Sequence, residues 1–381
     1  MTRAHRTIQI SQPSTGEEEW QALREPLASG WLTQGPKVAE FETAFAHGHG
    51  VRHALATTSC TTALHLALAA LRIGHGDEVV VPAFTWIATA NAVLYCGATP
   101  VFADVDESTY NIDPDALAAA LGPRTRAVMP VHLFGLAADL DAIRARLPDD
   151  VLVVEDAACA AGARYRDQPV GGLGDAAAFS FHPRKSITTG EGGMLTTDRD
   201  DVAELAGRLR THGAGTSAED RHLSGAPYLL PAFEELGFNY RMTDLQAAIG
   251  VVQLAKLDRF IDDRDRLARI YLRELADLAW LRLPVVPAGC RHAWQAFVTV
   301  VGDDAPLPRN AIMEQLHERG IATRPGTHCV PELGVYRERL APGAGHFPTA
   351  AMLERRSMAL PLHNRMSEDD VLYVVEALHD V

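Results

Sequence analysis

Two kinds of apolar segment alternate along the first two thirds of the 381-residue chain, and this alternation limits the possible folds more than any other feature. Short β-prone runs predict buried strands, and the segments between them carry apolar residues at helical spacing. Strands that alternate with helices predict an α/β fold, in which helices cover both faces of a mostly parallel sheet. We expect strands at residues 78–83, 100–103, 126–130, 151–155, 176–181 and 193–197, and helices at residues 61–71, 86–95, from Asp113 onward, and 137–146.

The pattern changes at residue 243, where a helical stretch with dense charge begins and runs to residue 280. A predicted strand at 295–301 and a predicted helix at 309–319 follow it. We therefore expect a large domain at residues 1–255 and a smaller α+β domain at residues 256–381 that includes the connecting helix. A chain of this length with 47% hydrophobic residues can bury a large core beside a smaller one.

Charge and composition argue against several classes of function. The formal net charge of −14 argues against a nucleic-acid-binding protein, because phosphate backbones require a basic face. No apolar run approaches the roughly 20 residues that cross a bilayer, and residues 1–7 lack the apolar core of a signal peptide. The five cysteines are scattered and odd in number, which is typical of a cytoplasmic protein and indicates neither a disulfide framework nor a metal site.

One lysine, Lys185, lies in a polar loop between two of the predicted buried strands. A long cation is costly there unless it has a chemical task, and one such task is a Schiff base with an aldehyde cofactor. The predicted strand at 151–155 leads into Asp156. Ligands of an open parallel sheet bind at the carboxyl ends of its strands, so we expect both side chains at one crevice. A Schiff-base lysine with an aspartate for the pyridinium nitrogen indicates a pyridoxal-phosphate enzyme.

The segment Ser180-Phe-His-Pro-Arg-Lys185, followed by Thr189-Gly-Glu-Gly-Gly193, resembles the lysine segment of the DegT/StrS-type sugar aminotransferases. Further segments resemble the same family in the same order, at residues 30–36, 82–86, 130–135, 155–156 and 237–242. The resemblance implies a fold-type I pyridoxal-phosphate enzyme with aminotransferase activity, and a smaller C-terminal domain beside the large one.

The resemblance also implies roles for residues around the cofactor ring. Lys185 would be the catalytic lysine, and Asp156 would keep the ring nitrogen protonated. Trp86 stands at the position of the aromatic residue that stacks on the ring. Many members carry a glutamine that orients the ring hydroxyl where this chain has Cys159. A thiol supplies no amide donor, so we expect Cys159 to pack against the ring as a small apolar side chain.

Contacts to the cofactor phosphate are implied at four positions. Cys60 and Thr61 open a predicted helix whose first N–H groups can bind an anion. Members usually have Asn-Gly-Thr here, so Thr61 is the stronger candidate, and an ordinary N-cap cluster is the alternative interpretation. Ser180 resembles a further phosphate contact. Asn239 resembles the asparagine that reaches the phosphate of the neighbouring subunit, which would require a homodimer with shared sites.

Other polar residues are weaker candidates. His182, near the lysine, either contacts substrate or packs as a neutral histidine. Arg324 and His328 lie where the small domain is expected to face the site, and Arg324 would pair with the carboxylate of the amino donor. His47-Gly-His49 predicts a glycine-rich surface loop rather than a metal site, and Gly171-Gly-Leu-Gly174 lacks the context of a dinucleotide fingerprint.

The resemblance implies a double displacement in which glutamate or glutamine gives its amino group to the cofactor, and a keto sugar then receives it. The acceptor is expected to be a nucleotide-linked 4-keto-6-deoxyhexose. A keto cyclitol or another ketone of antibiotic biosynthesis is the alternative. Sugar dehydratases of the same fold have a histidine at the lysine position, and a non-catalytic regulatory protein would have lost Lys185 or Asp156, so both are less favoured.

Overall fold

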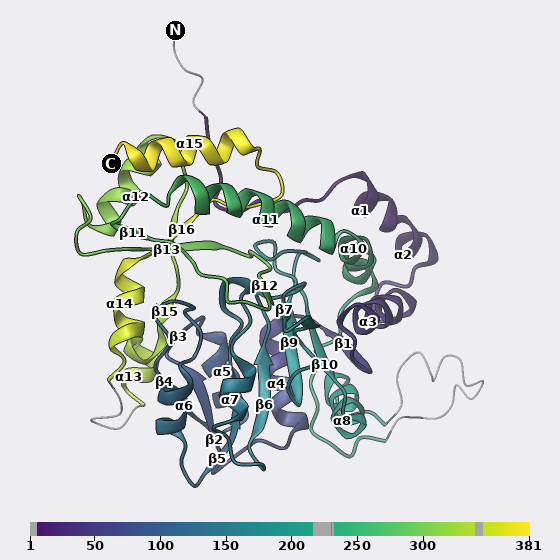
Figure 1. Ribbon diagram of the computed structural model, residues 1–381. Helices are drawn as coiled ribbons and strands as arrows, with labels where there is room; N and C mark the ends of the chain where they lie inside the picture. The colour runs from purple at the N-terminus through teal and green to yellow at the C-terminus, as the bar shows by residue number, and fades with distance from the viewer. Residues whose placement is uncertain (1–5, 216–229, 231, 340–345) are drawn as a thin grey trace.

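The computed structural model describes residues 6–215, 230, 232–339 and 346–381. A seven-stranded sheet lies between two layers of helices, and a smaller sheet with its own helices adjoins it (Figure 1). Residues 1–5, which belong to the stretch without a signal-peptide pattern, lie outside the described residues.

The central sheet has the strand order β1-β10-β9-β6-β5-β2-β4. The five strands from β9 to β4 are parallel to one another, whereas β10 is antiparallel to both β9 and β1. The prediction of a mostly parallel sheet is therefore confirmed. Its strands are β1 (His53–Thr57), β2 (Glu78–Pro82), β4 (Thr99–Ala103), β5 (Thr125–Val128), β6 (Leu152–Asp156), β9 (Ala176–Ser180) and β10 (Gly193–Thr197).

Successive strand residues point to opposite faces of the sheet, and each face has its own core. Val79 and Val81 pack with α4 (Cys60–Ala70), α5 (Ala88–Tyr95) and α8 (Asp200–Arg210). Val80 faces the other core, which is formed by α3 (Pro36–His49), α6 (Pro114–Ala120), α7 (Leu140–Arg144) and α10 (Asp244–Ala255). Burial on both faces explains why these strands read as continuous apolar runs.

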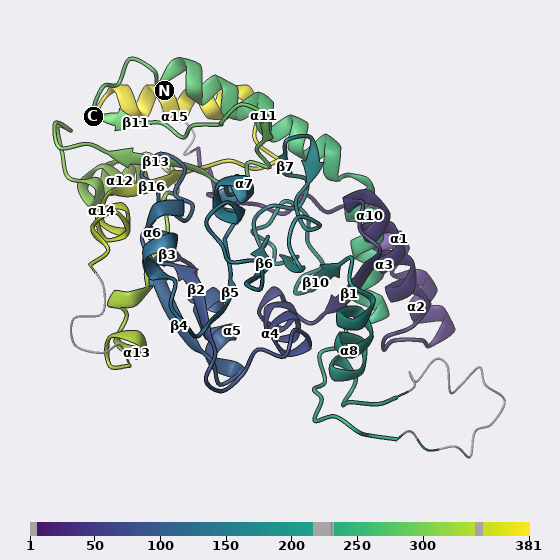
Figure 2. The same cartoon turned by 60° about the horizontal axis from the view of Figure 1, so that its bottom comes forward.

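The C-terminal part has an antiparallel sheet in the order β11-β13-β16-β14. Ile8 near the N-terminus makes an isolated parallel bridge to Ile321, which precedes β14. Figures 1 and 2 both show α11 and α15 side by side over this sheet. The domain division at residue 255 stays a prediction. The elements are α11 (Leu257–Glu274), β11 (Leu281–Arg282), β13 (Phe297–Val301), α12 (Arg309–Glu318), β14 (Arg324–Pro325), β16 (Ser357–Leu360) and α15 (Glu368–His379).

Short elements complete the described chain, and one of them shortens a predicted helix. Phe84 and Thr85 form β3, which pairs with β15, so the helix predicted at 86–95 begins only at Ala88. These elements are α1 (Glu17–Ala22), α2 (Arg24–Ser29), β3 (Phe84–Thr85), η1 (Leu133–Gly135), β7 (Arg164–Tyr165), β8 (Gln168–Pro169), β12 (Cys290–Arg291), β15 (His328–Cys329), η2 (Val330–Glu332), α13 (Gly334–Arg337) and α14 (Pro348–Arg356).

The prediction of a surface loop around His47 and His49 is wrong. Both residues lie in the last turn of α3, and His49 is buried. The helical repeat places His49 one turn after Phe45, on whose ring it stacks at 3.9 Å between centroids. Burial lowers the pKa of His49 to about 4, so it packs as a neutral ring.

Within the described ranges, no helix is both long enough and apolar enough to cross a membrane. The same residues include no group of three or more His, Cys, Asp or Glu side chains placed to hold a metal ion.

Candidate active site

Two neighbouring parallel strands, β6 and β9, end at the residues that the sequence singled out. Asp156 is the last residue of β6 and Ser180 the last of β9, and the loop that follows Ser180 carries Lys185. The Lys185 Nζ atom lies 3.1 Å from the Cys159 Sγ atom, just beyond the end of β6. The structure therefore brings Lys185, Asp156 and Cys159 to one edge of the sheet, as predicted from the ends of parallel strands.

Asp156 is 4% exposed and has a defined hydrogen-bond partner on each oxygen. Thr89 Oγ1 donates to its Oδ2 at 2.8 Å, and the Ala158 N–H donates to its Oδ1 at 3.1 Å. Burial raises the pKa of Asp156, while these hydrogen bonds and the charge of Lys185 oppose the increase. A cation placed against this carboxylate would favour its charged form further.

Thr89 holds Asp156 from the start of α5, and the sequence analysis missed it. Its Oγ1 lies 3.0 Å from Thr85 Oγ1, so Thr85 can donate to Thr89 while Thr89 donates to Asp156. Both threonines are buried. Their spacing of four residues was the available signal, but nothing in the sequence indicated which carboxylate they would contact.

Cys60 and Cys159 line the same site as thiols. Burial raises the pKa of Cys60 well above its ordinary value; the Asp156 charge adds to this effect, and the Lys185 charge opposes it. Cys60 is therefore a neutral thiol at neutral pH. Cys159 is half-buried and contacts the lysine amine directly.

The start of α4 presents backbone N–H groups to this edge of the sheet. Ser59 is the N-cap residue, and its side chain accepts from the Thr62 N–H at 3.2 Å. The amides of Cys60 and Thr61 precede the first intrahelical bond, made by Ala63, and are placed to bind an anion. Gly193 packs against this turn so closely that a Cβ atom would lie 2.5 Å from the Cys60 nitrogen, so only glycine fits.

Trp86 and His328 lie side by side, and Trp86 directly follows Thr85, the partner of Thr89. Trp86 is 55% exposed, and its ring centroid is 5.8 Å from that of His328. The pairing of β15 with β3 brings His328 there from the C-terminal part, and Thr327 Oγ1 donates to the Thr85 carbonyl at 2.9 Å. His328 also contacts Glu354 at 3.2 Å. An exposed tryptophan of this kind is available to stack on a planar ligand.

The remaining predicted residues have different surroundings. His182 is half-buried in the lysine loop and accepts the Arg184 N–H on Nδ1 at 3.2 Å; burial lowers its pKa, so it is neutral at neutral pH. Arg324 is exposed on β14 and pairs through its backbone with Ala359. Asn239 is exposed, and the next residue, Tyr240, accepts the Thr58 N–H at 3.0 Å near the start of α4.

Glu155, the neighbour of Asp156 in β6, points away from it and has a structural role. Its Oε2 lies 2.9 Å from His132 Nε2, and its two oxygens accept the N–H groups of Gly171, Leu173 and Gly174. The glycine-rich segment that failed the dinucleotide pattern is thus a loop folded around a buried carboxylate. This arrangement fixes β6 from the face opposite to Asp156.

Comparison with known proteins identifies the family. The chain belongs to the DegT/DnrJ/EryC1/StrS aminotransferase family, whose sequence profile matches residues 13–379. It is 42% identical over 379 residues to the spore coat polysaccharide biosynthesis protein SpsC of Bacillus subtilis, covering 98% of this chain and 97% of that protein. The prediction of the family and of aminotransferase activity is therefore confirmed.

Solved structures agree with the fold. The aminotransferase TlmJ of Streptoalloteichus hindustanus is 34% identical and superposes with a TM-score of 0.89, covering 98% of both chains. Spr1654 of Streptococcus pneumoniae, solved in a PLP form, is 28% identical with a TM-score of 0.90, again covering 98% of both chains. The predicted fold of a pyridoxal-phosphate aminotransferase is confirmed.

Proposed function

We propose that this aminotransferase binds pyridoxal phosphate at Lys185 and transfers an amino group from glutamate or glutamine to a keto sugar. The observation that carries the proposal is the convergence of Lys185 and the buried Asp156 at the ends of two adjacent parallel strands. Each group alone has a simple structural explanation, but a half-buried lysine near a buried aspartate at the carboxyl ends of adjacent parallel strands is typical of a functional site.

The residues present fit this cofactor. Asp156 offers a buried carboxylate, already oriented by Thr89, for a protonated ring nitrogen. The first amides of α4, with the Thr61 and Ser180 hydroxyls, offer donors for a phosphate, which a helix N-terminus favours by its dipole. Trp86 offers an exposed aromatic face and Cys159 a small polarizable side chain. Each of these donors is a backbone amide or a hydroxyl group, so none carries a negative charge that would repel a phosphate.

The chain's own groups would then divide the work. Pyridoxal phosphate supplies an aldehyde that condenses with amines and a ring that withdraws electrons from the reacting carbon. Asp156 keeps the ring nitrogen protonated through its negative charge. Lys185 would hold the cofactor between turnovers, and its free amine would act as the general acid and base that moves a proton during amino transfer. His182, His328 and Arg324 are proposed as substrate contacts, with Arg324 directed at the donor carboxylate.

A keto sugar as acceptor is supported by the relative SpsC, which is a protein of spore coat polysaccharide biosynthesis. We expect the purified protein with glutamate or glutamine to convert a nucleotide-linked 4-keto-6-deoxyhexose to its amino sugar, detected by mass spectrometry as replacement of the keto oxygen by an amine. A panel of keto sugars and keto cyclitols makes the test decisive. Amination of cyclitols alone would favour the alternative acceptor, and no amination with either donor would contradict the proposal.

All five cysteines lie in described segments and are free, which suits the cytoplasm as the proposed location.

We further propose a homodimer in which Asn239 contributes to the partner's phosphate site. Its side chain is exposed beside the turn that opens α4, where a second subunit can reach it. An isologous two-fold interface would place the two copies of this segment at two equivalent composite sites.

Mixing Lys185→Ala and Asn239→Ala variants under subunit exchange is expected to restore activity. With shared sites, a heterodimer holds both lesions in one site and none in the other, so it should reach about half of the wild-type rate. Turnover of the mixture, compared with each variant alone and normalised to the heterodimer fraction, measures this. The Asn239→Ala rate must first be shown to be low. A confirmed heterodimer without recovery would mean that Asn239 serves its own subunit.

A further inference from the structure

The loop that carries Lys185 is held by a residue from the C-terminal part of the chain. Gln295 Nε2 donates to the carbonyl of Arg184 at 2.9 Å, one residue before the lysine. Within the loop, the Lys185 N–H donates to the His182 carbonyl at 2.8 Å. The two hydrogen bonds hold the carbonyl and the N–H of the same peptide unit, the one that joins Arg184 to Lys185, and only the first comes from outside the loop.

The residue before Gln295 has a strained backbone. Trp294 has a φ angle of +48°, a left-handed conformation that is costly for a bulky residue and persists only where its surroundings enforce it. Trp294 is 1% exposed, and its ring stacks on His292 at 4.0 Å between centroids. Its backbone N–H donates to His292 Nδ1 at 2.8 Å, and its indole N–H donates to Asp265 Oδ1 at 2.9 Å. Strain of this kind is a reason to look for a function nearby.

A buried cation fixes the same turn from the other side. Arg264 on α11 is 3% exposed, and its Nη1 donates to the carbonyls of Trp294 at 3.0 Å and Leu362 at 3.2 Å, while its Nε donates to Asn364 Oδ1 at 2.9 Å. Burial lowers the pKa of Arg264 to about 10, which still leaves it charged at neutral pH. A charged donor makes strong hydrogen bonds to carbonyl oxygens, so the carbonyl next to Gln295 is held firmly.

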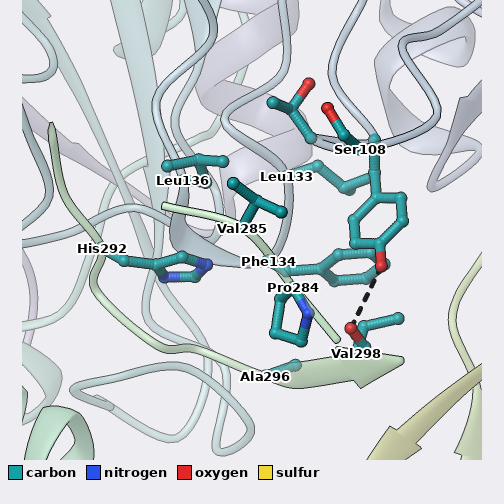
Figure 3. Close-up of a pocket in the computed structure, with 11 residues that line it drawn as sticks. Ser108, Leu133, Phe134, Leu136, Pro284, Val285, His292, Ala296 and Val298 are labelled. Atoms are coloured by element: carbon teal, nitrogen blue, oxygen red, sulfur yellow. Dashed lines mark hydrogen bonds between the residues drawn. The ribbon is translucent and has the colours of Figure 1, made fainter. Parts of the chain in front are cut away.

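The turn is also hydrogen-bonded to η1, which follows β5 of the large sheet. Ala293 N–H donates to the Gly135 carbonyl at 2.8 Å, and Ala296 N–H donates to the Phe134 carbonyl at 3.3 Å. Gly135 has a φ angle of +103°, and a Cβ atom there would lie 3.0 Å from the Gln295 nitrogen, so the approach requires glycine. Figure 3 shows Phe134 and His292 lining the same small pocket as Ala296 and Val298. The cavity at this seam measures about 10 Å³, room for a single water at most.

We propose that Gln295 is a positioning residue for the catalytic loop. The turn at residues 292–296, which we call the clasp, joins α11, η1 and the lysine loop, and the left-handed Trp294 turns the chain so that the Gln295 amide faces Arg184. Through this hydrogen bond, the position of the C-terminal part of the chain sets the position of the peptide that bears Lys185. The inference has two halves. The catalytic half, the effect of Gln295 on kcat, rests on the proposed role of Lys185. The mechanical half, the effect of Gln295 on the stability of the lysine loop, does not.

The test is Gln295→Met, which keeps the length of the side chain and removes its donor. Amide hydrogen exchange of the peptide spanning residues 182–188 in the full-length protein should become about fivefold faster, as expected from the loss of one ordinary hydrogen bond. In the same variant, kcat should fall by a similar factor with KM little changed, because the lysine is misplaced while the proposed substrate contacts outside the loop, His328 and Arg324, remain. Gln315→Met on α12 is the matched control and should change neither quantity.

Unchanged exchange in a folded Gln295→Met protein would overturn the proposal. Faster exchange with an unchanged kcat would overturn the catalytic half and leave Gln295 as a purely structural contact. Exchange is measured without substrate, so it reports on the clasp even if Lys185→Ala were to retain turnover. A failure of the proposed function is thereby distinguished from a failure of the clasp.

Discussion

Replacing Lys185 with alanine is expected to abolish amino transfer while leaving the fold intact. In the proposed mechanism the lost amine is both the attachment point for the cofactor and the acid and base that carries the proton, and general acid–base catalysis alone contributes about 10²- to 10⁴-fold. We therefore expect a fall in turnover of about 10³-fold or more. Lys185 is half-buried and its amine contacts the Cys159 thiol rather than an apolar core, so its removal costs little stability.

Turnover should be followed by mass spectrometry of the aminated product, with circular dichroism and thermal unfolding to confirm the fold. Lys37→Ala is the matched control, because Lys37 forms surface ion pairs with Glu25 and Glu40 on and beside α3, and its loss should leave turnover unchanged. Substantial turnover in a folded Lys185→Ala protein would remove the proposed mechanism.

Asp156→Asn is expected to give the second largest effect, a loss of turnover of about 10²-fold or more with weaker retention of the cofactor. Asparagine has nearly the same shape and can still accept from the Ala158 N–H or pair with Thr89. It is neutral, however, so it no longer favours the protonated ring nitrogen. The substitution therefore separates the charge of Asp156 from its packing.

The measurements are kcat and the cofactor content of the protein after gel filtration. Asp115→Asn is the control, since Asp115 lies exposed on α6 and forms a surface ion pair with Arg146. Full activity of Asp156→Asn would show that another group holds the ring nitrogen. Restoration by high cofactor concentration alone would assign Asp156 to binding rather than to catalysis.

The sequence by itself determined six of the seven strands of the main sheet and pointed to the two central residues of the candidate site. Strand and helix periodicities are local properties, so the alternation predicted β2, β4, β5, β6, β9 and β10 with small errors at their ends. Lys185 and Asp156 could be identified because each lies just beyond the end of a predicted strand, and parallel strands present their carboxyl ends at one edge. Local capping also predicted the start of α6, where Asp113 accepts the Asp115 and Ala116 N–H groups at 2.8 Å.

Only the tertiary structure decided which side chains support these two residues. Thr89 and Asp156 are 67 positions apart, and Gln295 and Arg184 are 111 apart, so no local pattern links them. The burial of His49 likewise depends on Phe179 of β9, which packs against its ring. Such contacts arise from how helices and strands pack against one another, and many alternative partners satisfy the same periodicity. Periodicity selects the face that a residue occupies, whereas three-dimensional packing selects its partner.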